Sequence, residues 1–244
     1  MSRGFTCAGR THPGREREQN EDAWAVDAET GLVLVADGMG GHAGGAVAAA
    51  FVAETFPSLV TQRIGEKALD VPETAAALKE CVAESSEALR EQGAAQPELC
   101  GMGATLVAAL LRDNLALIVH MGDSRAYQFH SGALERLTAD HSFAELLIAS
   151  GDLTEEEAAH HPAQHQITRY AGMDGPPQPE TRLVERLPGD LFMLCSDGLY
   201  GEVEAETISG ILGTDAPLEA RCEQLIGAAN AAGGHDNITV VLAQ

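Results

Sequence analysis

The feature that most constrains this sequence is a repeated junction between an apolar segment and an aspartate beside glycine or asparagine. Three predicted strands end at such a junction and a fourth begins just after one. In chain order the dipeptides are Asp37-Gly38, Gly122-Asp123, Asp197-Gly198 and Asp236-Asn237. These pairs are also common in turns, but carboxylates at several strand ends gather at the rim of a sheet and repel one another unless a cation neutralises them. Because the ligands on offer are oxygens without a Cys or His cluster, the pattern predicts Mg²⁺ or Mn²⁺ rather than zinc.

The order of strands and helices predicts a β-rich core with paired helices. Segments rich in branched aliphatic residues predict strands at 32–36, 105–111, 115–121, 125–130, 181–187, 191–195 and 238–243. Helical patterns cover 43–59, 72–93 and 217–230. The turn residues Asn114 and Ser131-Gly132 leave room only for short connections, so the strands on either side are antiparallel. A doubly wound parallel sheet is therefore not expected.

The length of 244 residues, with no internal repeat, predicts one domain over residues 1–244. The sequence changes character over residues 141–179, which combine polar helical pieces, an acidic run and the breaker Gly175-Pro176-Pro177. A segment of about 40 residues rarely builds a core by itself. We expect residues 141–179 to form an insertion over one edge of the sheet.

The composition excludes several partners. Asp and Glu number 37 against 15 Lys and Arg, a net charge of −22, and nucleic acid or an anionic membrane would require a basic face. The five cysteines are scattered without a C-x-x-C pair, so they predict neither a disulfide framework nor a zinc ribbon. The longest apolar run, residues 46–53, is too short for a membrane span. We expect a cytoplasmic monomer with no membrane segment.

A basic residue stands close to two further carboxylates near the N-terminus. Arg17 precedes Glu21 by four residues and Asp22 by five. A guanidinium is a planar fork that suits phosphate oxygens. Taken alone, this stretch is also typical of a solvent-exposed charged run.

Together these motifs resemble the metal-dependent protein phosphatases of type 2C, the PPM class, in its compact bacterial form. Seven motifs occur in the order found in that family and span nearly the whole chain. They are R-x-x-N-E-D at 17–22, V-A-D-G-M-G-G-H at 35–42, G-M-G-A-T at 101–105, G-D-S-R-A-Y at 122–127, L-T-A-D-H-S at 137–142, S-D-G-L at 196–199 and G-H-D-N-I-T at 234–239. The resemblance implies an α+β fold, a four-layer α-β-β-α sandwich of two antiparallel sheets flanked by helix pairs, with residues 141–179 as a flap.

The resemblance also implies a pair of Mn²⁺ or Mg²⁺ ions at one end of the sandwich. Asp37 would bridge the two ions. The Gly38 carbonyl would bind one of them, and Asp197 and Asp236 would bind the other.

The remaining site residues are assigned by the same resemblance. Glu21 and Asp22 would act mainly through metal-bound waters, and Asp123 would hold a third, weaker ion together with Asp197. Arg17 would bind the substrate phosphate. Arg17 and Asp37 are thus the residues expected to carry catalysis.

The implied activity is hydrolysis of phosphoserine and phosphothreonine on proteins, by attack of a water activated between the two metal ions. The natural partners would be phosphoproteins, namely a serine/threonine kinase and its targets. Two positions depart from familiar members. Met39 stands where many eukaryotic relatives carry a histidine assigned as general acid, which leaves the proton donor to the leaving alcohol unassigned, and Ala104 replaces a more usual threonine or serine.

Two other functions fit parts of the sequence. The pattern Gly38-x-Gly40-x-x-Ala43 after a predicted strand matches a dinucleotide-binding turn, although Asp37 before it would repel a pyrophosphate. A binding module that keeps the phosphatase fold without catalysis is the second alternative. It would be expected to lack a metal-binding aspartate, and Asp37, Asp197 and Asp236 are all present.

Overall fold

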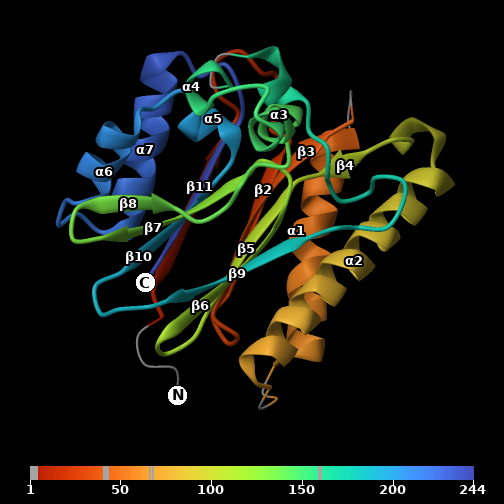
Figure 1. Ribbon diagram of the computed structural model, residues 1–244, viewed down its shortest axis with the longest axis horizontal. Helices are drawn as coiled ribbons and strands as arrows, with labels where there is room; N and C mark the ends of the chain where they lie inside the picture. The colour runs from red at the N-terminus through yellow and green to blue at the C-terminus, as the bar shows by residue number, and fades with distance from the viewer. Residues whose placement is uncertain (1–4, 41–43, 66, 68, 159–160) are drawn as a thin grey trace.

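Two antiparallel β-sheets lie face to face at the centre of the structure, which is a computed structural model describing residues 5–40, 44–65, 67, 69–158 and 161–244 (Figure 1). The five-stranded sheet has the order β1 (Cys7–His12), β11 (Ile238–Ala243), β10 (Leu191–Cys195), β7 (Arg125–His130) and β8 (Ala133–Arg136). The six-stranded sheet has the order β2 (Asp22–Asp27), β3 (Leu32–Met39), β5 (Leu106–Leu111), β6 (Leu115–Met121) and β9 (Glu180–Glu185), with β4 (Gly103–Ala104) paired to β3.

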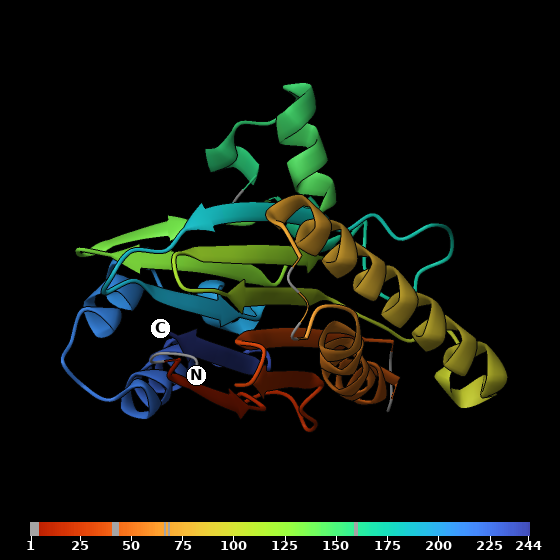
Figure 2. The same ribbon diagram turned by 90° about the horizontal axis from the view of Figure 1, so that it is seen from below.

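Helices cover the outer face of each sheet. The long helices α1 (Gly44–Arg63) and α2 (Val71–Ala95) pack on the six-stranded sheet, and the short 3₁₀ turn η1 (Pro97–Leu99) follows them. The helices α5 (Asp197–Tyr200), α6 (Ala205–Leu212) and α7 (Leu218–Ala232) pack on the five-stranded sheet. This arrangement is the four-layer α-β-β-α sandwich predicted from the sequence (Figure 2).

The two-residue period of a strand explains why the central strands read as continuous apolar runs. In β3, Leu34 packs toward α1 and α2, and Val35 packs toward the other sheet. In β10, Phe192 lies between the sheets and Met193 faces α5–α7. Both faces of these strands are therefore buried, and the apolar core forms three layers.

Helix α1 is the one helix among the described residues that is long and apolar enough to meet the length and composition test for a membrane span, with a mean hydropathy of 1.3. Its buried side chains, including Phe56, pack on the six-stranded sheet. A core helix of this kind passes the same test, so the match is weak evidence for a membrane segment.

Of the four strands that the sequence analysis missed, β1, β2 and β8 lie at sheet edges and β4 is a two-residue strand paired to β3. β1 ends in the exposed residues Thr11 and His12, and β2 is half-buried along most of its length. β1 offers no apolar run, and the run of β2 is only residues 23–26 with a single branched aliphatic side chain, because an edge strand is covered on fewer sides. The predicted antiparallel pairing is confirmed, and it contradicts the dinucleotide-binding alternative, which requires parallel strands. Of the glycine-rich motif at 35–42, Gly41 and His42 lie outside the described residues, as does Ala43 of the predicted helix start.

The segment between β8 and β9 forms the predicted flap, which projects from the sandwich (Figure 2). It contains α3 (Phe143–Ser150), α4 (Glu155–Ala158) and η2 (Pro162–His165), and these share a small cluster of buried alanines, Ala144, Ala158 and Ala163. Two isolated bridges tie its ends: Ser142 pairs with Ile167, and Ala171 pairs with Ala104.

Candidate metal centre and active site

Antiparallel pairing brings the strand-end aspartates to one end of the sandwich. Asp22 at the start of β2 is the register partner of Asp37 near the end of β3. Asp123 lies in the turn between β6 and β7, Asp197 follows β10, and Asp236 precedes β11. Because neighbouring strands run in opposite directions, the start of one strand and the end of the next lie at the same end of the sandwich.

Four carboxylates of this cluster, Asp22, Asp37, Asp123 and Asp197, have raised pKa values because they are enclosed together. Burial raises the pKa of Asp37 well above its usual range, and the neighbouring charges of Asp22, Asp197, Asp123 and Asp236 raise it further. Burial raises the pKa of Asp22 to about 7, against hydrogen bonds that lower it. Burial and then the charge of Asp197 raise the pKa of Asp123 to about 7. Such a set of buried like charges is unfavourable without a cation.

Two buried carboxylate oxygens have no hydrogen-bond partner among the described residues: Asp22 Oδ1 and Asp197 Oδ1. The other oxygen of Asp22 accepts a hydrogen bond from the Ser196 hydroxyl at 2.7 Å. An unpaired buried carboxylate oxygen costs free energy, and a hard divalent cation is the ligand that relieves it. The cluster therefore fits Mg²⁺ or Mn²⁺ on its own geometry.

Backbone oxygen is also available at this end of β3. The Gly38 N–H donates to the Glu21 carbonyl at 3.0 Å. A Cβ added to Gly45, in the first turn of α1, would lie 2.5 Å from Glu21 Oε2 and 2.9 Å from the Gly38 carbonyl oxygen. The Glu21 carboxylate and the Gly38 carbonyl thus lie beside the same glycine, and the start of α1 closes over both.

Arg17 contacts a member of the aspartate cluster. Its Nη2 donates to Asp236 Oδ2 at 2.8 Å, and both side chains are partly exposed. The loop that carries Arg17 is fixed by Asn237, whose Oδ1 accepts from the Glu21 N–H at 2.7 Å and whose Nδ2 donates to the Pro13 and Gln19 carbonyls at 3.0 and 2.9 Å. All the sequence-predicted site residues therefore lie at this end of the sandwich.

Sequence reasoning missed the residues that orient this cluster. Thr105 Oγ1 accepts from the Asp37 N–H at 2.9 Å and shares a 2.7 Å hydrogen bond with Ser124 Oγ. Asn237 Oδ1 accepts from the Glu21 N–H, and the Ser196 hydroxyl donates to Asp22 Oδ2. Each of these residues stands inside a motif, but its partner lies far away in the sequence, so the motif alone does not show which group it contacts.

A close backbone contact explains why position 198, next to Asp197, is a glycine. A Cβ on Gly198 would lie 2.1 Å from the Asn237 carbonyl oxygen, so this contact brings the segment of Asp197 against that of Asp236. We expect Gly198→Ala to lower the free energy of unfolding by about 2 kcal/mol or more through overpacking, and to lower Mn²⁺ affinity. Calorimetric unfolding and Mn²⁺ titration measure both effects.

A matched control for this prediction lies in α7. A Cβ on the exposed Gly227 meets nothing within 4 Å. Gly227→Ala should raise the free energy of unfolding by roughly 0.5–1 kcal/mol, because alanine has the higher helix propensity. Equal effects of the two substitutions would contradict the packing argument.

The comparisons with known proteins decide the family. The sequence model described as protein phosphatase 2C matches residues 8–242. The chain belongs to the protein phosphatase 2C family. It is a protein serine/threonine phosphatase, and the predicted family and enzyme class are confirmed.

Individual relatives are similar to this chain over all or nearly all of its length. The serine/threonine phosphatase stp of Listeria monocytogenes is 33% identical over 238 residues, which cover 96% of this chain and 94% of that protein. The crystal structure of the phosphatase Stp1 from Staphylococcus aureus superposes with a TM-score of 0.89 at 31% identity, covering 100% of this chain and 96% of that one. The catalytic domain of PstP, in complex with 2 manganese ions, superposes with a TM-score of 0.83 at 36% identity, covering 98% and 97%.

Proposed function

We propose that the aspartate cluster holds two divalent cations, Mn²⁺ or Mg²⁺, with which this phosphatase hydrolyses phosphoserine and phosphothreonine on proteins. The observation that carries the proposal is the set of buried carboxylates with raised pKa values and two unpaired oxygens, on Asp22 and Asp197. The PstP catalytic domain, similar over nearly the whole chain, was solved with 2 manganese ions.

The ligand assignment follows the contacts of the cluster. We assign Asp37 as the bridging ligand because its side chain is the most enclosed by other carboxylates. The Gly38 carbonyl binds one ion, and Asp197 and Asp236 bind the other.

Further carboxylates surround this pair. Glu21 and Asp22 act mainly through metal-bound waters. Asp22 is the register partner of Asp37, and the Glu21 carboxylate lies beside the Gly38 carbonyl. Asp123 holds a third and weaker ion together with Asp197, whose charge raises the pKa of Asp123 more than that of any other carboxylate.

The chain's own side chains position the substrate. When bound, the two cations lower the pKa of a water and stabilise negative charge on the phosphoryl oxygens. Arg17 binds the phosphate through its fork of N–H donors, one of which is oriented by Asp236. Buried Cys195 takes no part as a nucleophile, because burial raises the pKa of its thiol to about 12.

Arg17 offers a direct test of substrate binding. Arg17→Ala should lower kcat/KM for a phosphothreonine peptide by roughly 10²–10³-fold, the effect of losing one positioned donor to a charged transition state. Arg17→Lys should recover only part of this, because lysine lacks the bidentate fork. Steady-state kinetics with saturating Mn²⁺ measures both.

Arg15, exposed in the same loop, provides the control. Arg15→Ala should leave kcat/KM within about twofold of the wild type, as expected for a surface charge away from the phosphate. An Arg17→Ala variant with wild-type kcat/KM would contradict the role proposed for Arg17.

The biological setting follows from the chemistry. The opposing enzyme is a serine/threonine kinase, because phosphorylation by such a kinase supplies the substrate. A cytoplasmic, monomeric, single-domain enzyme is consistent with five free cysteines and a net charge of −22. The same charge makes nucleic acid a poor partner.

A further inference from the structure

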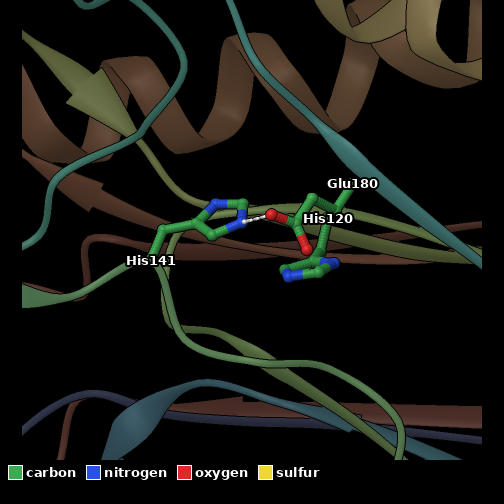
Figure 3. Close-up of side chains that lie close together, drawn as sticks. All are labelled: His120, His141 and Glu180. Carbon is green, nitrogen blue, oxygen red and sulfur yellow. Dashed lines mark ion pairs between the residues drawn. The ribbon is translucent and has the colours of Figure 1, made fainter. Parts of the chain in front are cut away.

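Two histidines and a glutamate lie together beside the base of the flap (Figure 3). His120 belongs to β6, His141 opens the flap and Glu180 begins β9, and their ligand-type atoms lie within 4.8 Å of one another. The two imidazole rings stack with their centroids 4.6 Å apart. This group is separate from the aspartate cluster and has no role in the mechanism above.

Its hydrogen bonds argue against a metal site. The Gly122 N–H donates to His141 Nδ1 at 3.1 Å, so the neutral ring carries its proton on Nε2, which lies 3.4 Å from Glu180 Oε1. The single lone pair of this ring is already used, whereas a metal-bound imidazole needs it free. Arg169 Nη1 lies 3.3 Å from the same His141 Nε2 and donates to Glu180 Oε1 at 2.7 Å, so both side chains direct an N–H at this carboxylate and Arg169 supplies the positive charge there. Glu180 is thus the acceptor shared by His141 and Arg169, and we call His141, Glu180 and Arg169 the relay.

One end of the relay holds an active-site turn. Two hydrogen bonds join His141 to Gly122, because the His141 backbone N–H also donates to the Gly122 carbonyl at 2.9 Å. Gly122 has a φ of +123°, and a Cβ there would lie 2.6 Å from the Thr105 Cβ. The turn is therefore closely packed, and it leads directly into Asp123.

The other end of the relay belongs to the flap and β9. The Thr168 N–H donates to the His141 carbonyl at 2.7 Å, and Arg169 follows it in the chain. The His120 ring, fixed by a 2.9 Å hydrogen bond between its Nε2 and the Ala139 carbonyl, covers one face of His141. His141 is only 5% exposed, so its ring has one orientation that serves both ends.

We propose that His141 is a positioning residue that couples the flap to the cation site of Asp123. Glu180 and Arg169 fix the tautomer and orientation of His141, and His141 in turn fixes the Gly122–Asp123 turn. The contacts of Glu180 and Arg169 with His141 at the base of the flap thereby set the affinity of the Asp123 site for its cation. The inference rests on the proposed function, since it takes Asp123 as a ligand.

Two substitutions separate the two ends of the ring. In His141→Asn the side-chain oxygen can replace Nδ1 as acceptor for Gly122 but cannot reach Glu180. In His141→Gln the amide can reach the position of Nε2, and the Gly122 N–H loses its acceptor. The readouts are hydrogen exchange of the Gly122 amide in the metal-free protein and Mn²⁺ titration by calorimetry.

We expect His141→Gln to speed Gly122 exchange at least about tenfold and to weaken Mn²⁺ binding at the weaker site roughly tenfold, as for a lost outer-sphere partner. His141→Asn should keep Gly122 protected. Glu180→Ala should weaken the same Mn²⁺ step about threefold in the wild type and have no further effect in His141→Asn. This non-additivity is the mark of coupling through one residue.

Two results would overturn the proposal: equal Gly122 exchange in the Asn and Gln variants, or a Glu180→Ala effect that is the same in both backgrounds. Zn²⁺ binding that is lost on replacing His120 would also overturn it, by showing a metal site in place of the relay. Failure of the proposed function is distinct, because wild-type protein would then show no Mn²⁺-dependent phosphate release.

Discussion

Asp37→Asn should lower phosphate release from a phosphothreonine peptide at least about 10³-fold, because losing a bridging ligand costs more than the 10–100-fold of an outer-sphere partner. The same variant should unfold at a higher temperature than the wild type when both are metal-free. Its amide replaces a carboxyl group whose ionised form the folded protein disfavours, because burial and then the charges of Asp22 and Asp197 raise the pKa of Asp37. The two opposite effects are measured by steady-state kinetics with Mn²⁺ and by thermal unfolding in EDTA.

The opposite signs separate a lost ligand from a damaged fold. A variant that merely misfolds loses both activity and thermal stability. Asp113→Asn is the control, since Asp113 is exposed in the turn between β5 and β6, and it should change neither quantity. Activity above a tenth of the wild type, or a lower unfolding temperature in EDTA, would contradict the role of Asp37.

Without metal, the wild type should lose stability relative to Asp123→Asn as the pH rises. Burial raises the pKa of Asp123 to about 7 from an ordinary value of 3.8. Between these values the folded state keeps a proton that the unfolded state has lost, so raising the pH favours unfolding. The penalty is absent below about pH 3.8, grows through this window and is complete above pH 7.

The expected size follows from 1.36 kcal/mol per pH unit below the folded pKa. Between pH 5 and pH 8, Asp123→Asn should gain roughly 3 kcal/mol in free energy of unfolding over the wild type. Urea unfolding in EDTA at four pH values measures this difference, and comparing the two proteins cancels the titration of the shared histidines. Saturating Mn²⁺ should reverse the order of stability. A difference that stays constant with pH in EDTA would mean that Asp123 ionises freely in the folded protein.

The sequence predicted which aspartates meet at one end of the sandwich better than it predicted the edge strands. The aspartates Asp37, Asp197 and Asp236 were found because each follows or precedes a fully buried strand, and antiparallel pairing then requires such ends to meet. β1 and β2 were missed because β1 carries no apolar run and β2 carries only a short one, with a single branched aliphatic residue. The local hydrophobic pattern marks strands that are buried on both faces. It does not show whether a strand has a neighbour on one side or on both.

The supporting contacts of the site could not be predicted. Asn237 binds the carbonyl of Pro13 and the N–H of Glu21, more than 200 positions away in the chain. Ser196 and Asp22 are joined over 174 positions. These hydrogen bonds exist only once the two sheets have packed, so a single sequence shows the residue types but not their partners.

The most direct test of the central claim is phosphate release from a phosphothreonine peptide by the wild-type protein, measured in EDTA and during back-titration with Mn²⁺. We predict no release in EDTA and full recovery as Mn²⁺ binds the aspartate cluster. Release that persists in EDTA would contradict metal-dependent hydrolysis. A folded, Mn²⁺-loaded protein that releases no phosphate would contradict catalysis itself and would favour a binding module with the phosphatase fold.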